Sequence, residues 1–228
     1  MKMISFLWNQ SNKIIFCIVA ILTASSIAFA QNETPLFKDL LFNKHKSVLE
    51  QDKTFEDCSR EIGSAALCKE NVKFLEHEFI QVLIFIDERL RLVQLVTEFD
   101  LSLHQKIFKV LANQFSLVAM QSGDKRLDIL NVVSTEKRDV GVSKIGAFEQ
   151  GGLETGKLSY IFSELPRKDA KKYKNYGEYV RSIPENTREI TLEIEQEGKE
   201  SAYLRVYFAL PKRALGEMRK SSPKVEKF

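Results

Sequence analysis

The chain has 228 residues, with 34 Lys and Arg against 31 Asp and Glu, for a formal net charge of +3. A protein built to hold nucleic acid normally shows a clear basic excess, so this balance argues against that class. Hydrophobic residues make up 44% of the chain, which excludes global disorder. A chain of this length buries roughly 70% of its unfolded surface, enough for a sizeable core without a metal.

The first thirty residues have the order of a cleavable secretory signal. Lys2 and Lys13 precede an apolar run at residues 14–22 (IIFCIVAIL). Small residues follow this run and end at Ala30. This order predicts cleavage between Ala30 and Gln31, export to the periplasm or the outside, and a mature net charge of +1. The alternative is an uncleaved membrane anchor. Its span of about 17 residues is at the lower limit for crossing a bilayer.

Near the start of the mature chain, Thr34 and Pro35 predict a helix that continues to about Val48. Residues 102–105 (SLHQ) form a capping box, which predicts a second long helix that reaches about Gln114.

Two cysteines, Cys58 and Cys68, remain after signal removal. An even number in an exported chain predicts a disulfide. Thr54 is the expected N-cap of a short helix over Phe55–Ile62, and Gly63 is its expected stop. The bond would then tie this helix to the next segment. A zinc site or a redox CxxC pair does not fit the spacing.

Two apolar runs, 80–86 and 90–99, predict central strands joined by a three-residue loop at 87–89. This pairing places Ile84 opposite Leu92. Both faces of the two strands are largely apolar, so we expect helices to cover at least one of them.

The second half of the chain is divided by turn residues and glycines. Half of the glycines lie within 139–157, so this stretch is expected to be a loop. The other expected elements are strands at 115–120, 127–133 and 158–162, a basic segment at 167–181 and a hairpin at 189–210.

Matching apolar faces predicts the register of that last hairpin. The buried pairs are Ile190 with Phe208, Leu192 with Val206, and Ile194 with Leu204, around a turn at 198–200. The opposite face pairs Thr191 with Tyr207, Glu193 with Arg205, and Glu195 with Tyr203.

Tyr203, Arg205 and Tyr207 are therefore a candidate recognition patch, because Tyr and Arg are enriched among interface hot spots. The alternative is ordinary cross-strand pairing on a solvated face.

The basic segment offers a second candidate surface. Tyr173, Tyr176 and Tyr179 recur every third residue within it. The segment could meet an acidic protein, anionic lipid headgroups or a glycan. The alternative is a solvated helix or loop whose tyrosines cap the core.

The mixed runs of strands and helices favour an α+β fold, with a mainly antiparallel sheet and helices packed on one face. We expect one domain over 31–211, with two sub-units joined near 132–157 as the alternative, and a mobile polar tail at 212–228. The order helix, hairpin, helix between Thr54 and Gln114 resembles small bacterial envelope modules such as the beta-lactamase inhibitor protein and outer-membrane assembly lipoproteins. This resemblance implies a fold only.

No catalytic, cofactor-binding or metal-binding residue is predicted. Residues 151–158 nearly match a phosphate-binding loop, but Leu158 lacks the hydroxyl that a magnesium ion needs. Residues 134–137 match SxxK without the companion motifs of penicillin-recognising enzymes. On an alternating strand, His77 points away from both neighbouring glutamates.

These features together predict an exported, non-enzymatic binding module. Its partner would be another protein or an envelope component, and not nucleic acid, and no transmembrane segment is expected after signal removal. The alternative is a small secreted hydrolase with carboxylates that are distant in sequence.

Overall fold

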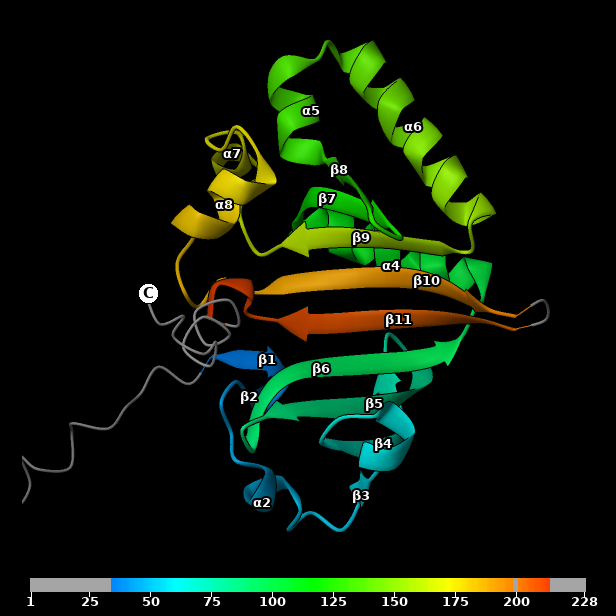
Figure 1. The fold of residues 1–228 in the computed structure, drawn as a ribbon, viewed down its shortest axis with the longest axis vertical. Helices are drawn as coiled ribbons and strands as arrows, with labels where there is room; N and C mark the ends of the chain where they lie inside the picture. Colours follow the sequence, from blue (N-terminus) through cyan, green and yellow to red (C-terminus); the bar gives the residue numbers. More distant parts are fainter. Residues whose placement is uncertain (1–33, 199–200, 214–228) are drawn as a thin grey trace, which may run out of the picture. The chain divides into compact units, whose positions relative to one another are not determined.

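The computed structural model describes residues 34–198 and 201–213. Within them the chain forms an α+β fold built on a nine-stranded antiparallel sheet (Figure 1), which confirms the fold class predicted from sequence. The strands are β1 (Pro35–Phe37), β2 (Leu40–Leu41), β3 (Glu56–Asp57), β4 (Ala66–Phe74), β5 (His77–Ile86), β6 (Arg89–Glu98), β7 (Ser116–Ser122), β8 (Lys125–Asp128), β9 (Lys157–Ser163), β10 (Glu189–Glu197) and β11 (Ser201–Ala209). The helices are α2 (Lys46–Leu49), α3 (Ser59–Ile62), α4 (Leu101–Gln114), α5 (Ile129–Thr135), α6 (Arg138–Glu154), α7 (Arg167–Ala170) and α8 (Tyr176–Ser182).

The last three strands of the sequence lie in the middle of the sheet. The strand order is β3-β4-β5-β6-β11-β10-β9-β7-β8, so β9, β10 and β11 separate β6 from β7. Four strand spacings of about 4.8 Å give a gap of about 19 Å between β6 and β7. Helix α4 joins these two strands, and its 14 residues span about 21 Å at 1.5 Å per residue. The helix is therefore long enough to cross the inserted strands (Figure 1).

One face of the sheet, called here the covered face, carries the main core. Helix α4 packs on it through Leu103, Ile107 and Leu111, all at least 96% buried. The β1–β2 hairpin packs on the same face, with the rings of Phe37 and Phe208 centred 4.8 Å apart. Both elements bury the large apolar side chains of the central strands.

The opposite face, called here the open face, carries a smaller core at one end. Helix α8 packs there on β7 and β9, with Tyr179 and Ile161 in one buried cluster. Figure 1 shows α7 and α8 beside this end of the sheet, whereas α4 lies behind it.

The predicted register of the C-terminal hairpin is confirmed. Ile190 pairs with Phe208, Leu192 with Val206 and Ile194 with Leu204, and all six side chains are buried on the covered face. Gly198 begins the turn with φ 72°, a conformation that glycine adopts without strain. Lys199 and Glu200, the other two residues of the predicted turn, lie outside the described residues.

The predicted central hairpin is confirmed with one change in its turn. Ile84 lies opposite Leu92 as expected, but a bulge follows and Ile86 pairs with Arg89. The loop is therefore two residues long. Asp87 and Glu88 both have positive φ, the geometry of a type I′ turn, which matches the twist of the strands.

Two predicted helices near the N-terminus are wrong. Residues after Thr34 form the β1–β2 hairpin, closed by a hydrogen bond from Phe42 N to Thr34 O of 2.9 Å. Thr54 does not cap a helix, because Glu56 pairs with Cys68 at the edge of the sheet and α3 begins only at Ser59. In both places strand pairing, within the β1–β2 hairpin and between β3 and β4, overrides the local helix signals. The predicted stop at Gly63 is confirmed, with φ 74°.

Helix α4 also begins earlier than its predicted capping box. The side chain of Asp100, not Ser102, accepts a hydrogen bond from Leu103 N at 2.6 Å. The strand predicted over 127–133 is wrong beyond Asp128. The Asp128 side chain accepts a 2.9 Å hydrogen bond from Asn131 N and caps the start of helix α5.

The glycine-rich loop predicted over 139–157 is wrong, because α6 occupies most of it. Two of its glycines lie where the helix meets a neighbour. A Cβ at Gly152 would stand 2.6 Å from Leu158 Cδ1, and one at Gly141 would stand 3.1 Å from Val132 Cγ1. Glycine therefore permits α6 to pack closely on β9 and α5, in spite of its low helix propensity.

Candidate interaction face of the sheet

The predicted patch residues lie together on the open face. Tyr203, Arg205 and Tyr207 alternate along β11 and pair with Glu195, Glu193 and Thr191 of β10, as the sequence predicts. On the other side of β11, β6 sets Glu98, Val96 and Gln94 opposite the same three residues. The patch is thus the middle of a four-strand surface made by β5, β6, β11 and β10.

Arg205 is held by three glutamates of β10. Its guanidinium forms an ion pair with Glu195, lies 3.8 Å from Glu193 and bonds Glu197 at 2.9 Å. It also lies over the Tyr203 ring, 5.6 Å from the ring centre. Only 15% of the Arg205 side chain is exposed, so its donors face its own sheet rather than solvent.

Glu193 is the buried centre of this cluster. Its carboxylate accepts a 2.8 Å bond from Ser159 Oγ on β9 and another 2.8 Å bond from the Tyr207 hydroxyl. Burial and the adjacent Glu193 charge together raise the pKa of Tyr207. Because an unpaired buried charge is costly, these contacts make Arg205 and Tyr207 part of the structure of the sheet.

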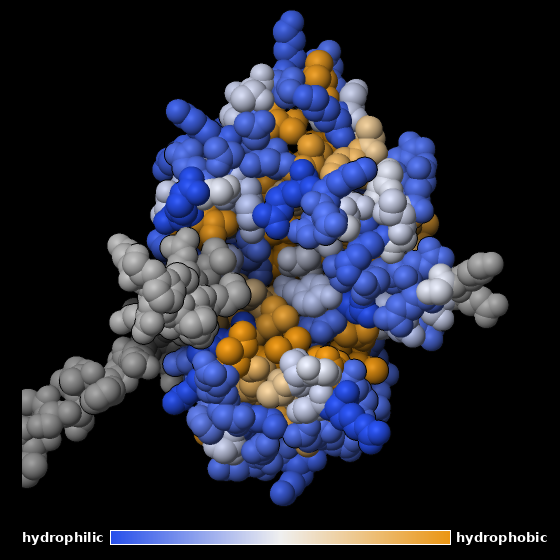
Figure 2. Space-filling model, in the orientation of Figure 1, coloured by the Kyte–Doolittle hydropathy of each residue, from blue (hydrophilic) through white to orange (hydrophobic). Residues whose placement is uncertain are grey.

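An apolar strip lies beside the cluster on the same face. Ile80 and Ile86 of β5 remain 46% and 50% exposed, and the partly buried Ile84 and Leu92 lie between them and the centre of the face. Figure 2 shows apolar side chains gathered over β5 and β6 in the same view as Figure 1. The residue pattern of these strands already suggested two apolar faces, but not which of them the described helices would leave free.

The tyrosines of the basic segment turn inward instead of forming a surface row. Tyr179 is fully buried, and its ring centre lies 5.5 Å from that of Tyr173 and 5.7 Å from that of Tyr176. The Tyr179 hydroxyl donates to Ser163 Oγ on β9. Much of this cluster therefore anchors α8 to the sheet.

A carboxylate lies beneath these tyrosines. Glu189 accepts a 2.8 Å bond from the Tyr176 hydroxyl, and Arg126 stacks on the Tyr176 ring at 4.9 Å. Burial raises the pKa of Glu189 to about 7, although the hydrogen bond and the Arg126 charge act in the opposite direction. Sequence analysis missed this residue, because Glu189 reads as an ordinary polar position at a strand start.

The covered face holds one further polar cluster. The Tyr160 hydroxyl donates to Glu149 of α6, and His104 lies beside that ring with 5.7 Å between centroids. His104 Nε2 is buried and has no hydrogen-bond partner in the described part of the chain. Burial lowers the pKa of His104 and the Glu149 charge raises it, with burial the larger effect.

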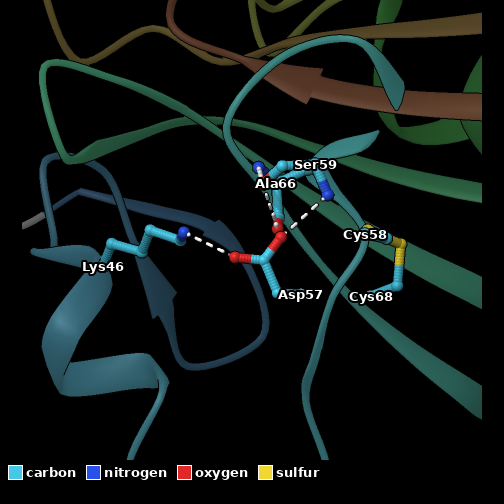
Figure 3. Close-up of a disulfide and its surroundings, with 6 residues drawn as sticks. All are labelled: Lys46, Asp57, Cys58, Ser59, Ala66 and Cys68. Atoms are coloured by element: carbon cyan, nitrogen blue, oxygen red, sulfur yellow. Dashed lines mark hydrogen bonds and ion pairs between the residues drawn. A yellow bond between two sulfur atoms is a disulfide. The ribbon is translucent and has the colours of Figure 1, made fainter. Parts of the chain in front are cut away.

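The predicted disulfide is present between Cys58 and Cys68, whose Cα atoms are 5.8 Å apart (Figure 3). It joins the start of α3 to β4 at the edge of the sheet. Asp57 accepts bonds from Ser59 N at 2.9 Å and Lys46 Nζ at 3.0 Å, and these contacts lower the pKa of its carboxyl. Ser59 Oγ in turn bonds both the N–H and the carbonyl of Ala66.

Two weaker motifs of the sequence lie at the ends of helices α5 and α6. Residues 151–158 run from the end of α6 into β9, the reverse of the strand-to-helix order of a phosphate-binding loop. Residues 134–137 end α5 and lead into α6. Ala30 and Gln31, the predicted cleavage pair, lie outside the described residues, as does the tail from 214.

Among the described residues, no group of three or more His, Cys, Asp or Glu side chains is placed to hold a metal ion. None of the helices within 34–198 and 201–213 is long and apolar enough to cross a membrane. Searches found no matching family model, no curated relative and no similar solved structure.

Proposed function

We propose that this protein is an exported, non-enzymatic binding module that docks another envelope protein on the open face of its sheet. The observation that carries the proposal is the exposed Ile80 and Ile86 strip beside the Tyr203 and Arg205 cluster. Interfaces commonly combine an apolar centre with aromatic and arginine side chains and a polar rim. The signal-like N-terminus and the disulfide are consistent with export.

Charge indicates the chemistry of the partner. The open face of β6, β9, β10 and β11 presents four glutamates around Arg205, namely Glu98, Glu193, Glu195 and Glu197, and the cations Arg205 and Lys157. Four glutamates outnumber the two cations, so the edge at Glu98 and Glu197 keeps a net negative charge among the described residues. We therefore expect the partner to place apolar side chains on the isoleucine strip and basic side chains at that edge.

The alternative function, a hydrolase with a dispersed carboxylate pair, has weaker support. Glu189 and Glu193 are the most buried glutamates on this face, but they lie four residues apart along one strand. Their Cα atoms are thus about 13 Å apart at 3.3 Å per residue, and glycoside cleavage needs carboxyl groups about 5–9.5 Å apart. Both are also engaged, by Tyr176 and by Ser159 and Tyr207.

Site-specific photocrosslinking in the producing cell tests the proposal. The photoreactive residue p-benzoylphenylalanine would replace Ile80 in one variant, Tyr203 in a second and Val142 in a control. Val142 is 62% exposed on α6, which lies away from the open face. We expect the same protein adduct from positions 80 and 203 and not from 142. Equal adducts from all three positions, or none from 80 and 203, would contradict the proposal.

A further inference from the structure

A cavity of about 680 Å³ lies at the other end of the sheet, where α4, α5 and α7 meet β7. The hollow is partly open at the surface, so it is a pocket and not an enclosed void. Its volume is within the roughly 300–1,000 Å³ of small-molecule sites. It lies apart from the open-face strip on β5 and β6.

The strand pattern explains why there is space here. Strand β8 pairs only with residues 119–122 of β7, so the first residues of β7, from Ser116, have no strand beside them on that edge in the described chain. Helix α5 follows β8 directly and lies along this edge in its place. A helix has a larger diameter than a strand, and the small side chain Ala170 of α7 leaves room beneath it.

The interior of the cavity is apolar. Phe108 of α4, Phe162 of β9 and Ile129 of α5 form its walls. The two serines in the lining are satisfied by the protein itself: Ser116 Oγ donates to Leu165 O at 2.7 Å, and Ser134 Oγ donates to Asn131 O at 3.0 Å. The walls thus suit a hydrocarbon chain and not a sugar or a nucleotide.

One charged side chain lines the cavity, and it is a cation at the mouth. Lys171 is exposed, as are Val133 and Ser134 across from it, whereas Phe162 is fully buried. Ser134 Oγ also lies 3.4 Å from the carbonyl oxygen of Lys174, three residues after Lys171. In the described chain the nearby Asp169 pairs with Lys172 at 2.5 Å, and no ion pair involves Lys171.

We propose that this cavity binds a single-chain amphiphile with a carboxylate head group, such as a medium- or long-chain fatty acid. The apolar chain lies between α4 and α5 against Phe108 and Val133, and the carboxylate lies at the mouth beside the Lys171 ammonium. This site does not depend on the proposed open-face interaction. Each could exist without the other.

Calorimetric titration of the exported, disulfide-bonded protein with decanoate tests the site, and decyltrimethylammonium is the probe with the opposite charge. We expect saturable decanoate binding at one site, at least about tenfold tighter than binding of the cation, since a charge-assisted contact is worth roughly that factor. Absence of saturable decanoate binding, or equal binding of both probes, would overturn the proposal.

Paired variants locate the site. Val133→Phe should obstruct the mouth and abolish binding, whereas Val142→Phe, at a similarly exposed helix position outside the cavity, should leave it unchanged. Lys171→Glu should weaken decanoate binding about tenfold, and Lys168→Glu, in helix α7 three residues earlier, should not. Melting temperatures show that each variant is folded. Unchanged binding in Val133→Phe would place decanoate elsewhere and overturn the assignment.

Discussion

The hydroxyl of Tyr176 donates a 2.8 Å hydrogen bond to the carboxylate of Glu189, which joins helix α8 to the first residue of strand β10. Burial raises the pKa of this carboxyl from 4.5 to about 7. The folded state therefore holds a proton on Glu189 at pH values where the unfolded chain has released it.

This difference makes stability depend on pH. Between about pH 4.5 and 7 the folded state binds more protons at Glu189, so the free energy of unfolding should fall as pH rises through this window. The loss should be about 3 kcal/mol and complete above pH 7. Chemical denaturation of wild type and Glu189→Gln across this range measures it, with the exposed Glu185→Gln as control. The same slope in wild type and Glu189→Gln would contradict the prediction.

Replacing Arg205 with alanine should destabilise the fold. Its removal leaves Glu193 buried without its cation, and breaking a buried pair typically costs about 3 kcal/mol. Lys157→Ala is the matched control, because its ion pair with Glu195 is 45% exposed on the lysine side and should contribute less than about 1 kcal/mol.

Adding Glu193→Gln to Arg205→Ala removes the unpaired charge and should recover part of the lost stability. Denaturant midpoints of the single and double variants give the comparison. If Arg205→Ala unfolds at the same midpoint as wild type, the cluster does not stabilise the fold and the prediction is contradicted.

Removing the disulfide should lower stability by about 3 kcal/mol, the loop-closure value for so short a ring. Cys58 and Cys68 are 10 residues apart, and the bond closes a segment at the sheet edge. The double variant Cys58→Ser/Cys68→Ser should therefore melt at a lower temperature than oxidised wild type. It should match reduced wild type. A double variant as stable as the oxidised protein would show that β3 and β4 stay paired without the bond.

The sequence predicts the paired strands better than the helices around them. Alternation along 189–210 determines the hairpin register, because a shift by one residue would move Leu192 and Val206 out of the core. The glycines of 139–157 gave the opposite result. Gly152 lets α6 approach β9 at Leu158. A local sequence pattern does not show which strand the helix packs against.

The candidate site shows the same division. The pairing of Glu193 with Arg205 follows from the hairpin alone. The burial of Glu193 also depends on Ser159 of β9, which local alternation does not place beside β10. The insertion of β9–β11 between β6 and β7 likewise depends on pairing between strands that are far apart in the sequence. It leaves the isoleucine strip of β5 on the same face as the Arg205 cluster.

The affinity of the crosslinked partner for surface variants tests the central claim most directly. Ile80→Ser/Ile86→Ser changes the strip at two exposed positions, and Val140→Ser/Val142→Ser makes a matched change at two exposed positions of α6. We predict that the first pair weakens binding by at least roughly 30-fold, about 2 kcal/mol, with an unchanged melting temperature, and that the second pair binds as wild type does. Equal affinity of both pairs for the partner would contradict the assignment of the open face as the binding surface.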